Sequence, residues 1–314
     1  MTPQAELAVC STSGGKDSLA TAAIAQDRLG RDACIFAFCD TGNEHELTLE
    51  YVADYLPTIF GPIRTLRADF SRQIAGKRAY LERHWPLDGV PAHIVENALS
   101  VLQPTGNPFL DLCLWKGRFP SRKAQFCTQF LKREPLDALM LNLLEHGHQV
   151  SSWRGIRRDE SQNRANAQEH EIAAEGWRIE HPIVAWTAQQ TVDFCRLRGL
   201  KLNPLYSLGM GRVGCMPCIN CAKDELLEIS KRFPEHVDRI RRWEGLVCMA
   251  AKRGWTTFFA GKAEDEESDA EIYARLNIDA RLRWAQSQHG GRKADWIREL
   301  QPAPACSSLY GLCE

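Results

Sequence analysis

The chain has 314 residues, of which 44% are hydrophobic and 25% are charged, and its formal net charge is −1. These values are ordinary for a globular protein, and the length suffices for one large α/β domain with an appendage or for two domains. No apolar run is long enough to span a membrane and the N-terminus lacks a secretory pattern, so we expect a cytoplasmic protein with no membrane partner. The near-neutral charge gives no bulk support for nucleic-acid binding, which requires a local basic surface.

Strands and helices alternate over the first 70 residues. We expect strands at 7–10, 34–39 and 63–68, and helices at 17–28 and 46–56. Such alternation predicts an α/β fold in which a doubly wound parallel sheet is covered by helices on both faces. Ligands of these sheets bind at the carboxyl ends of the strands.

The remaining chain divides into an insertion, the end of the sheet domain and a helical region. Five prolines interrupt residues 71–120, where we expect short helices. We assign residues 1–210 to a nucleotide-binding α/β domain and residues 211–314 to a C-terminal helical region with metal-binding cysteines. The other expected strands are 150–153 and 177–183, and the other expected helices are 136–144, 187–198, 224–233, 234–252 and 269–287.

A glycine-rich turn of sequence Ser-Gly-Gly-Lys-Asp-Ser follows the first expected strand and precedes the first helix. Glycines let backbone N–H groups approach an anion, and the helix N-terminus adds its positive dipole end. The spacing is not that of a Walker P-loop, and an ordinary turn capped by Asp17 is the alternative. The residues expected to bind nucleotide phosphates are Ser13, Gly14, Gly15, Lys16, Asp17 and Ser18.

Two other polar clusters follow expected strands. The sequence Asp40-Thr41-Gly42 places a carboxylate where it meets a ribose, an adenine edge or Mg²⁺, unless it only caps a turn. Four arginines, including Arg157 and Arg164, surround Gly155, and their planar donors suit phosphate or sulfate. A second basic cluster lies at 117–133. For both basic clusters the alternative is a solvated surface.

The chain has twelve cysteines, which in a reducing compartment indicate metal ligation or redox chemistry more than disulfides. Cys215, Cys218 and Cys221 have the spacing C-x2-C-x2-C, which suits Zn²⁺ or one side of an iron–sulfur cluster. The fourth ligand of a local cluster motif is absent, so further ligands must come from elsewhere. The candidates are Cys127, Cys306 and Cys313.

Because these motifs occur in this order, residues 5–230 resemble the 3′-phosphoadenosine 5′-phosphosulfate (PAPS) reductase-like family of N-type ATP pyrophosphatases. The similarity is greatest to the ATP pyrophosphatase subunit of DNA phosphorothioation systems. It implies an adenine nucleotide alpha hydrolase-like fold that binds ATP and Mg²⁺. It also implies attack on the ATP α-phosphate, which adenylates an acceptor, here nucleic acid, for sulfur insertion. A cysteine desulfurase or another sulfur donor protein is the implied partner. The implied catalytic residues are Lys16, Asp17, Cys127 and Arg157.

The resemblance leaves two alternatives open. One is a reductase of PAPS or of its relative without the 3′-phosphate. Such reductases carry a C-terminal Glu-Cys-Gly-Leu-His, whereas this chain ends Tyr-Gly-Leu-Cys313-Glu314. The other is a non-enzymatic nucleotide-binding subunit of a modification or defence complex. Reductases with a [4Fe–4S] cluster imply ligation by Cys127, Cys215 and Cys218, completed by Cys221 or by Cys306 and Cys313, with Zn²⁺ as the alternative metal.

Overall fold

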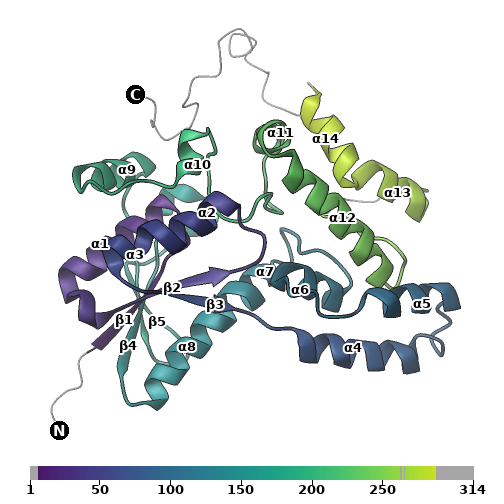
Figure 1. Ribbon diagram of the computed structural model, residues 1–314, viewed down its shortest axis with the longest axis horizontal. Helices are drawn as coiled ribbons and strands as arrows, with labels where there is room; N and C mark the ends of the chain where they lie inside the picture. The colour runs from purple at the N-terminus through teal and green to yellow at the C-terminus, as the bar shows by residue number, and fades with distance from the viewer. Residues whose placement is uncertain (1–5, 262–263, 265, 288–314) are drawn as a thin grey trace.

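The computed structural model describes residues 6–261, 264 and 266–287. Its centre is a six-stranded sheet in the order β3-β2-β1-β4-β6-β5 (Figure 1). Every neighbouring pair is parallel except β5 and β6, so the predicted parallel α/β fold is confirmed, with an antiparallel edge strand that was not predicted. The strands are β1 (Glu6–Ser11), β2 (Cys34–Asp40), β3 (Ile63–Arg67), β4 (Gln149–Trp153), β5 (His170–Ile172) and β6 (Arg178–Glu180).

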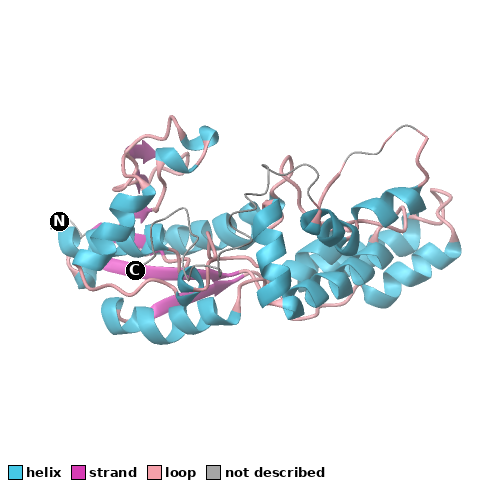
Figure 2. Cartoon of the chain, turned by 90° about the horizontal axis from the view of Figure 1, so that it is seen from above, coloured by secondary structure: helices cyan, strands magenta, loops and turns pink. Residues whose placement is uncertain are grey.

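Helices cover both faces of the sheet, which explains the apolar character of its strands (Figure 2). Alternate residues of β1 face opposite ways: Ala8 and Cys10 pack under α1 (Lys16–Leu29), whereas Val9 packs toward α8 (Glu134–Glu145). The α1 face also carries α9 (Ala188–Leu197) and the helical segment 46–60. That segment consists of α2 (Glu46–Glu50), a π-helical turn (Tyr51–Tyr55) and α3 (Leu56–Phe60).

Three element predictions differ from the structure. The expected helix 46–56 continues to Phe60, where Gly61 follows with φ +79°. The expected strand 177–183 is confined to β6. The expected helix 269–287 is two helices, α13 (Asp269–Leu276) and α14 (Ile278–Gln286). Asn277 separates them because its side chain accepts a hydrogen bond of 2.9 Å from the Ala280 N–H and starts a new helix.

A second core lies beside the sheet and is formed by helices and the loops between them (Figure 1). Its helices come from both sides of residue 210, so this core does not follow a division of the chain at that position. Phe109, Trp243 and Phe258 stack at its centre, and α12 crosses it with Ile240 and Val247 fully buried. Its helices include α4 (Ser71–His84), α5 (Ala92–Val101), α6 (Pro108–Lys116), α11 (Lys223–Arg232) and α12 (Pro234–Ala250), with α14.

Short elements join the two cores. They are α7 (Phe126–Thr128), a π-helical turn (Gln129–Arg133) that leads into α8, and α10 (Pro204–Ser207). Cysteines within the described ranges are all free thiols. Among the same residues no helix is both long and apolar enough to cross a bilayer. Cys306 and Cys313 lie outside the described residues.

A buried carboxylate ties α12 to the segments that follow it. Glu244, 1% exposed, accepts hydrogen bonds from the Phe258 N–H at 2.7 Å and from the Ile278 N–H at 2.9 Å. Burial raises the pKa of this carboxyl group from 4.5 to about 7, although both backbone donors oppose the shift. Between these two pKa values the folded protein binds a proton that the unfolded chain does not, so this group makes stability fall as the pH rises.

We therefore expect Glu244→Gln to remove part of the pH dependence of unfolding between pH 4.5 and 7. As the pH rises across this interval, the free energy of unfolding of the variant should increase relative to that of wild type by on the order of 1–3 kcal/mol. The reason is that glutamine does not ionise, whereas ionisation of the buried Glu244 opposes folding. Urea unfolding at several pH values measures the difference. Glu235→Gln, an exposed position of α12, is the control. Parallel pH profiles for wild type and Glu244→Gln would contradict this role.

Candidate functional site

The phosphate loop, residues 13–18, connects β1 to α1 at the carboxyl edge of the sheet. Gly14 has φ +79°, and a Cβ there would lie 3.0 Å from Thr48 Cγ2, so the tight turn favours glycine. Ser18 closes the loop: its Oγ accepts a hydrogen bond of 3.1 Å from the Ser13 N–H and donates one of 2.9 Å to the Gly15 carbonyl oxygen. The loop is thus held in shape by its own serine side chain before any ligand binds.

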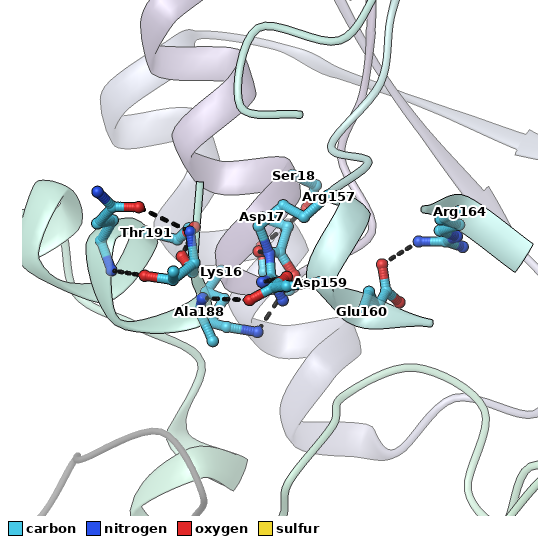
Figure 3. Close-up of polar contacts among 12 residues, drawn as sticks. Lys16, Asp17, Ser18, Arg157, Asp159, Glu160, Arg164, Ala188 and Thr191 are labelled. Carbon is cyan, nitrogen blue, oxygen red and sulfur yellow. Dashed lines mark hydrogen bonds and ion pairs between the residues drawn. The ribbon is translucent and has the colours of Figure 1, made fainter. Parts of the chain in front are cut away.

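Three of the four predicted catalytic residues form one chain of ion pairs (Figure 3). Lys16, only 4% exposed, places Nζ 3.1 Å from Asp17 Oδ2. The other Asp17 oxygen accepts a hydrogen bond of 2.5 Å from Arg157 Nε, and Arg157 also pairs with Asp159. Arg157 is 2% exposed, so its guanidinium braces the first turn of α1 from within the protein.

Arg164 is not part of this chain. Its side chain is 41% exposed and pairs with Glu160, apart from Asp17 (Figure 3). Sequence analysis expected Arg157 and Arg164 to hold one anion together. The structure brings only Arg157 to the phosphate loop, and contact between Arg164 and a nucleotide stays a prediction.

Gly155 allows the segment after β4 to lie against the phosphate loop. A Cβ at this position would lie 2.6 Å from both the carbonyl carbon and the carbonyl oxygen of Asp17, and 2.8 Å from the Ser18 nitrogen. Backbone atoms at these distances cannot move aside as a flexible side chain can. The approach therefore requires glycine, and it brings Arg157 within reach of Asp17.

We expect Gly155→Ala to displace this segment from α1 and to distort the phosphate loop. The free energy of unfolding should fall by about 1–3 kcal/mol, and ATP affinity should fall at least tenfold if the loop binds phosphates. Thermal unfolding and calorimetric ATP titration measure the two effects. Gly245→Ala in α12 is the matched control, because a Cβ there meets no atom within 4 Å. Equal behaviour of the two variants would show that the close approach is not needed.

The predicted cluster at the end of β2 forms a closed turn. Asp40 Oδ1 accepts a hydrogen bond of 2.8 Å from the Gly42 N–H, and Asp40 Oδ2 lies 3.6 Å from Arg67 Nη1. Thr41, which is buried, bonds to Glu44 through Oγ1 at 2.6 Å and through its N–H at 3.1 Å. The turn-capping alternative for Asp40 is thus present in the structure, and its contact with a ribose, adenine or Mg²⁺ stays a prediction.

A pocket of about 220 Å³ opens beside Asp40, between β2, β3 and the helical segment 46–60. Its walls are mostly apolar. Val52 also faces the phosphate loop, since its Cγ2 lies 3.5 Å from the position of a Gly14 Cβ. Val52 is thus a wall that the pocket and the loop share. Its lining residues are Phe38, Asp40, Leu49, Val52, Ala53, Pro57, Ile63 and Thr65.

The cysteine loop, residues 215–221, is joined to the end of β2. Cys215 forms an isolated β-bridge with Glu44, and its Sγ lies 3.5 Å from Thr41 Oγ1. The Met216 N–H donates a hydrogen bond of 2.7 Å to the Asn43 carbonyl oxygen. The segment that precedes the cysteine loop meets the phosphate loop, where the Tyr206 hydroxyl accepts a hydrogen bond of 3.2 Å from the Lys16 N–H.

The predicted metal ligands surround a cation. Burial raises the pKa of Cys215 to about 11, and the nearby Lys132 ammonium opposes the rise. The same proximity raises the pKa of Lys132, chiefly because of Cys215, with smaller effects of Cys218 and Cys127. Cys218 Sγ accepts a hydrogen bond of 3.5 Å from the Asn220 N–H. Cys127, Cys215 and Cys218 therefore all interact with the same ammonium group, that of Lys132.

The spacing of these thiols is wide. Within the part of the chain that the structure describes, no three cysteine sulfurs all lie within 4.8 Å of one another. Thiolates around one tetrahedral Zn²⁺ lie about 3.8 Å apart, as follows from zinc–sulfur bonds of ~2.3 Å. Cys127, Cys215 and Cys218 are near each other but not in the positions of a closed zinc site.

Sequence analysis missed a polar network that supports the cysteine loop. His236 Nε2 lies 3.0 Å from Glu46 Oε2, and the rings of His45 and His236 stack with centroids 4.7 Å apart. Ligand atoms of these three side chains all lie within 4.8 Å of one another. Arg239 donates hydrogen bonds to the Met216 carbonyl oxygen at 2.8 Å and to Asn43 Oδ1 at 3.0 Å. These residues are distant in sequence and follow no common motif, so no sequence signal could have found them. Lys132, by contrast, belongs to the basic cluster at 117–133, which the sequence did show.

The parallel sheet with a glycine-rich phosphate loop at its carboxyl edge defines an α/β nucleotide-binding protein. The model of the phosphoadenosine phosphosulfate reductase domain matches residues 108–221. An uncharacterized 37.8 kDa protein of Escherichia phage 186 is 40% identical over 98% of this chain and 96% of its own length. The adenosine 5′-phosphosulfate reductase of Mycolicibacterium smegmatis is 36% identical over 31% of this chain and 37% of its own length.

Residues 108–221 are thus similar to the PAPS reductase domain, as the motifs in this part of the chain predicted. The chain is also a full-length relative of the phage 186 protein. Among solved structures, the PAPS reductase of Candida auris in its phosphate complex is 15% identical, with a TM-score of 0.39 over 69% of this chain and 84% of that chain. The similarity to phosphorothioation pyrophosphatases stays a prediction.

Proposed function

We propose that the protein is an ATP pyrophosphatase that adenylates an acceptor, a nucleic acid, so that sulfur can be inserted into it. The observation that supports this most directly is the contact between the phosphate loop and the region of the cysteine loop. Tyr206 binds the Lys16 N–H, and Thr41, at the end of β2, lies against Cys215. A nucleotide on the loop therefore has its phosphates on the side of the molecule that carries the thiols.

In this proposal ATP binds with its phosphates at residues 13–18 and its base in the pocket beside Asp40. The walls of the pocket are mostly apolar, which suits a purine ring, and Val52 is shared between the pocket and the phosphate loop. Backbone N–H groups of the loop and the N-terminus of α1 stabilise the phosphates. Mg²⁺, bound with ATP, neutralises charge on the phosphates that leave.

The proposed reaction has two displacements at two centres. An acceptor oxygen first attacks the α-phosphorus of ATP, and the bond from that phosphorus to the bridging oxygen breaks, which releases pyrophosphate. A sulfur nucleophile, supplied by a cysteine desulfurase or another donor protein, then bonds to the acceptor while the acceptor–oxygen bond breaks and AMP leaves. Asp17, held between Lys16 and Arg157, keeps the first turn of α1 in position during the first displacement.

The second candidate is reduction of a sulfonucleotide. It is favoured by the match to the PAPS reductase domain and by the similarity to adenosine 5′-phosphosulfate reductases. The sequence around Cys313 differs from the Glu-Cys-Gly-Leu-His that the resemblance implies for such reductases. Pyrophosphate from ATP identifies the first function and sulfite from PAPS or its relative identifies the second. Nucleotide binding without either product identifies a non-enzymatic subunit of a larger complex.

We expect the purified protein to release pyrophosphate from ATP and Mg²⁺ when a nucleic-acid acceptor is present. Gly15→Val should reduce this activity more than tenfold, because the added side chain fills the space where phosphates approach the backbone. Its Cβ meets other atoms only at 3.5 Å or more, so the variant should still fold. Gly76→Val, on α4 with open space around its Cβ, is the control. Full activity in Gly15→Val would exclude the loop as the ATP site.

We also propose that the cysteines hold a [4Fe–4S] cluster rather than Zn²⁺. The donor set fits such a centre: Cys127 comes from α7, Cys215 and Cys218 come from the cysteine loop, and Cys221 follows. Among the described cysteines no three sulfurs lie within 4.8 Å of one another, as a closed zinc site would need, and Lys132 compensates thiolate charge. When bound, the cluster supplies a site for electron or sulfur transfer. These thiols stay reduced in the cytoplasm, where we place the protein.

Protein purified without oxygen should therefore be brown and contain iron and acid-labile sulfide in equal amounts. Cys218→Ser should lose most of the iron, since Cys218 is near both Cys127 and Cys221. Cys34→Ser, at the start of β2, should keep it. Metal analysis and the visible spectrum of each variant measure this. If the wild type contains stoichiometric zinc and no iron, and Cys218→Ser loses that zinc, the site is a zinc site and the cluster proposal is wrong.

A further inference from the structure

A second and larger pocket lies away from the one beside Asp40. It has a volume of about 530 Å³ and is formed where the end of α6 meets α7 and the π-helical turn that follows. This volume is within the range of ligand-binding pockets and exceeds what a lone inorganic ion requires. Its lining residues are Lys116, Arg118, Ala124, Gln125, Phe126, Thr128, Gln129, Phe130 and Arg133.

The charged groups that line this pocket are all cations: Lys116, Arg118 and Arg133. Burial lowers the pKa of Lys116, and the neighbouring charge of Arg118 lowers it further. Glu134, near Lys116, and Asp137, near Arg133, are carboxylates that lie outside the lining, and Glu134 accepts a hydrogen bond from Gln129 at 3.0 Å. The pocket thus collects positive charge without a carboxylate in its wall.

In the described part of the chain these cations have no hydrogen-bond acceptor. Among residues 6–261, 264 and 266–287, none of the three side chains forms an ion pair or donates a hydrogen bond. Two of them contact only aromatic faces: Lys116 Nζ is 3.7 Å from the Trp115 ring centroid, and the Arg118 guanidinium is 5.5 Å from that of Phe126. A concave group of unpaired cations is stabilised by an anionic ligand.

We propose that this pocket, named here the cationic pocket, binds a phosphate of the acceptor, and that the phosphate belongs to the phosphodiester backbone of a nucleic-acid strand. The inference rests on the proposed function, because it specifies where the acceptor lies. Arg118 and Arg133 suit a tetrahedral oxyanion through two-pronged hydrogen bonds. Side-chain amides and a hydroxyl in the wall add neutral donors.

The position of the cationic pocket relates it to the thiols. Phe126 and Thr128 both line it, and Cys127 stands between them on α7. A strand held by the pocket therefore runs beside a cysteine of the predicted metal set. The chain's net charge of −1 does not oppose this, since the positive charge is gathered locally.

The test measures binding of a short fluorescein-labelled single strand of DNA by fluorescence anisotropy over a range of salt concentrations. The double variant Arg118→Gln/Arg133→Gln should bind at least tenfold more weakly than wild type. The slope of log affinity against log salt should fall by about 1.4, which corresponds to ~0.7 for each lost phosphate contact. The matched control is Arg122→Gln/Lys123→Gln, which removes the same charge from exposed positions outside the pocket.

Each outcome decides between alternatives. Equal losses in the pocket and control variants would overturn the proposal in favour of diffuse surface charge. Inorganic phosphate that binds the wild type, with no binding of the strand, would reassign the pocket to a small oxyanion and overturn the nucleic-acid assignment. Thermal unfolding of each variant verifies that it is folded. If the wild type binds the strand in the pocket but releases no pyrophosphate from ATP, the proposed function is wrong and the proposal for the cationic pocket stands.

Discussion

The approach of the segment after β4 to the first turn of α1 is the constraint on which the candidate site depends. Gly155 allows two stretches of backbone to touch, and the ion pair between Asp17 and Arg157 holds them there. Burying this pair is costly unless its hydrogen bonds are complete, and Asp17 achieves this by accepting from Arg157 on one oxygen and pairing with Lys16 through the other. The loop of residues 13–18 is thereby shaped by residues from two distant strand ends.

A second junction brings the cysteine loop to the same edge. Backbone pairing between residues 43–44 and 215–216 fixes the position of the cysteine loop at this edge. Arg239 on α12 donates a hydrogen bond to the Met216 carbonyl oxygen. The first junction lies within the sheet part of the protein, and the second joins the end of β2 to Met216 of the helical core. Both consist mainly of polar contacts, so the relative position of residues 13–18 and the thiols depends on hydrogen bonds that are largely shielded from solvent.

The sequence predicted the parts of the protein that are local. Strand-helix alternation and the turn between β1 and α1 depend on residues within a few positions of each other, and both agree with the structure. The binding of phosphate by that turn stays a prediction. Contacts between distant segments were not predictable in the same way. Nothing in the sequence indicates that Arg157 is buried against Asp17 and Asp159, or that His236 meets Glu46. The cationic pocket was visible only as a basic stretch, because its shape depends on how the end of α6 meets α7.

The helical core has an implication for the order in which the chain becomes stable. Helices α4 to α6 precede β4 in the sequence, yet their apolar faces are covered by α12 and α14, which are made last. During synthesis Phe109 and its neighbours stay exposed to water until the final third of the chain has left the ribosome. The sheet, whose strands are complete by Glu180, has all its own partners earlier. The sheet can thus form while the helical core that includes α12 is still incomplete. During this period the exposed apolar residues of that core offer a binding site to a chaperone.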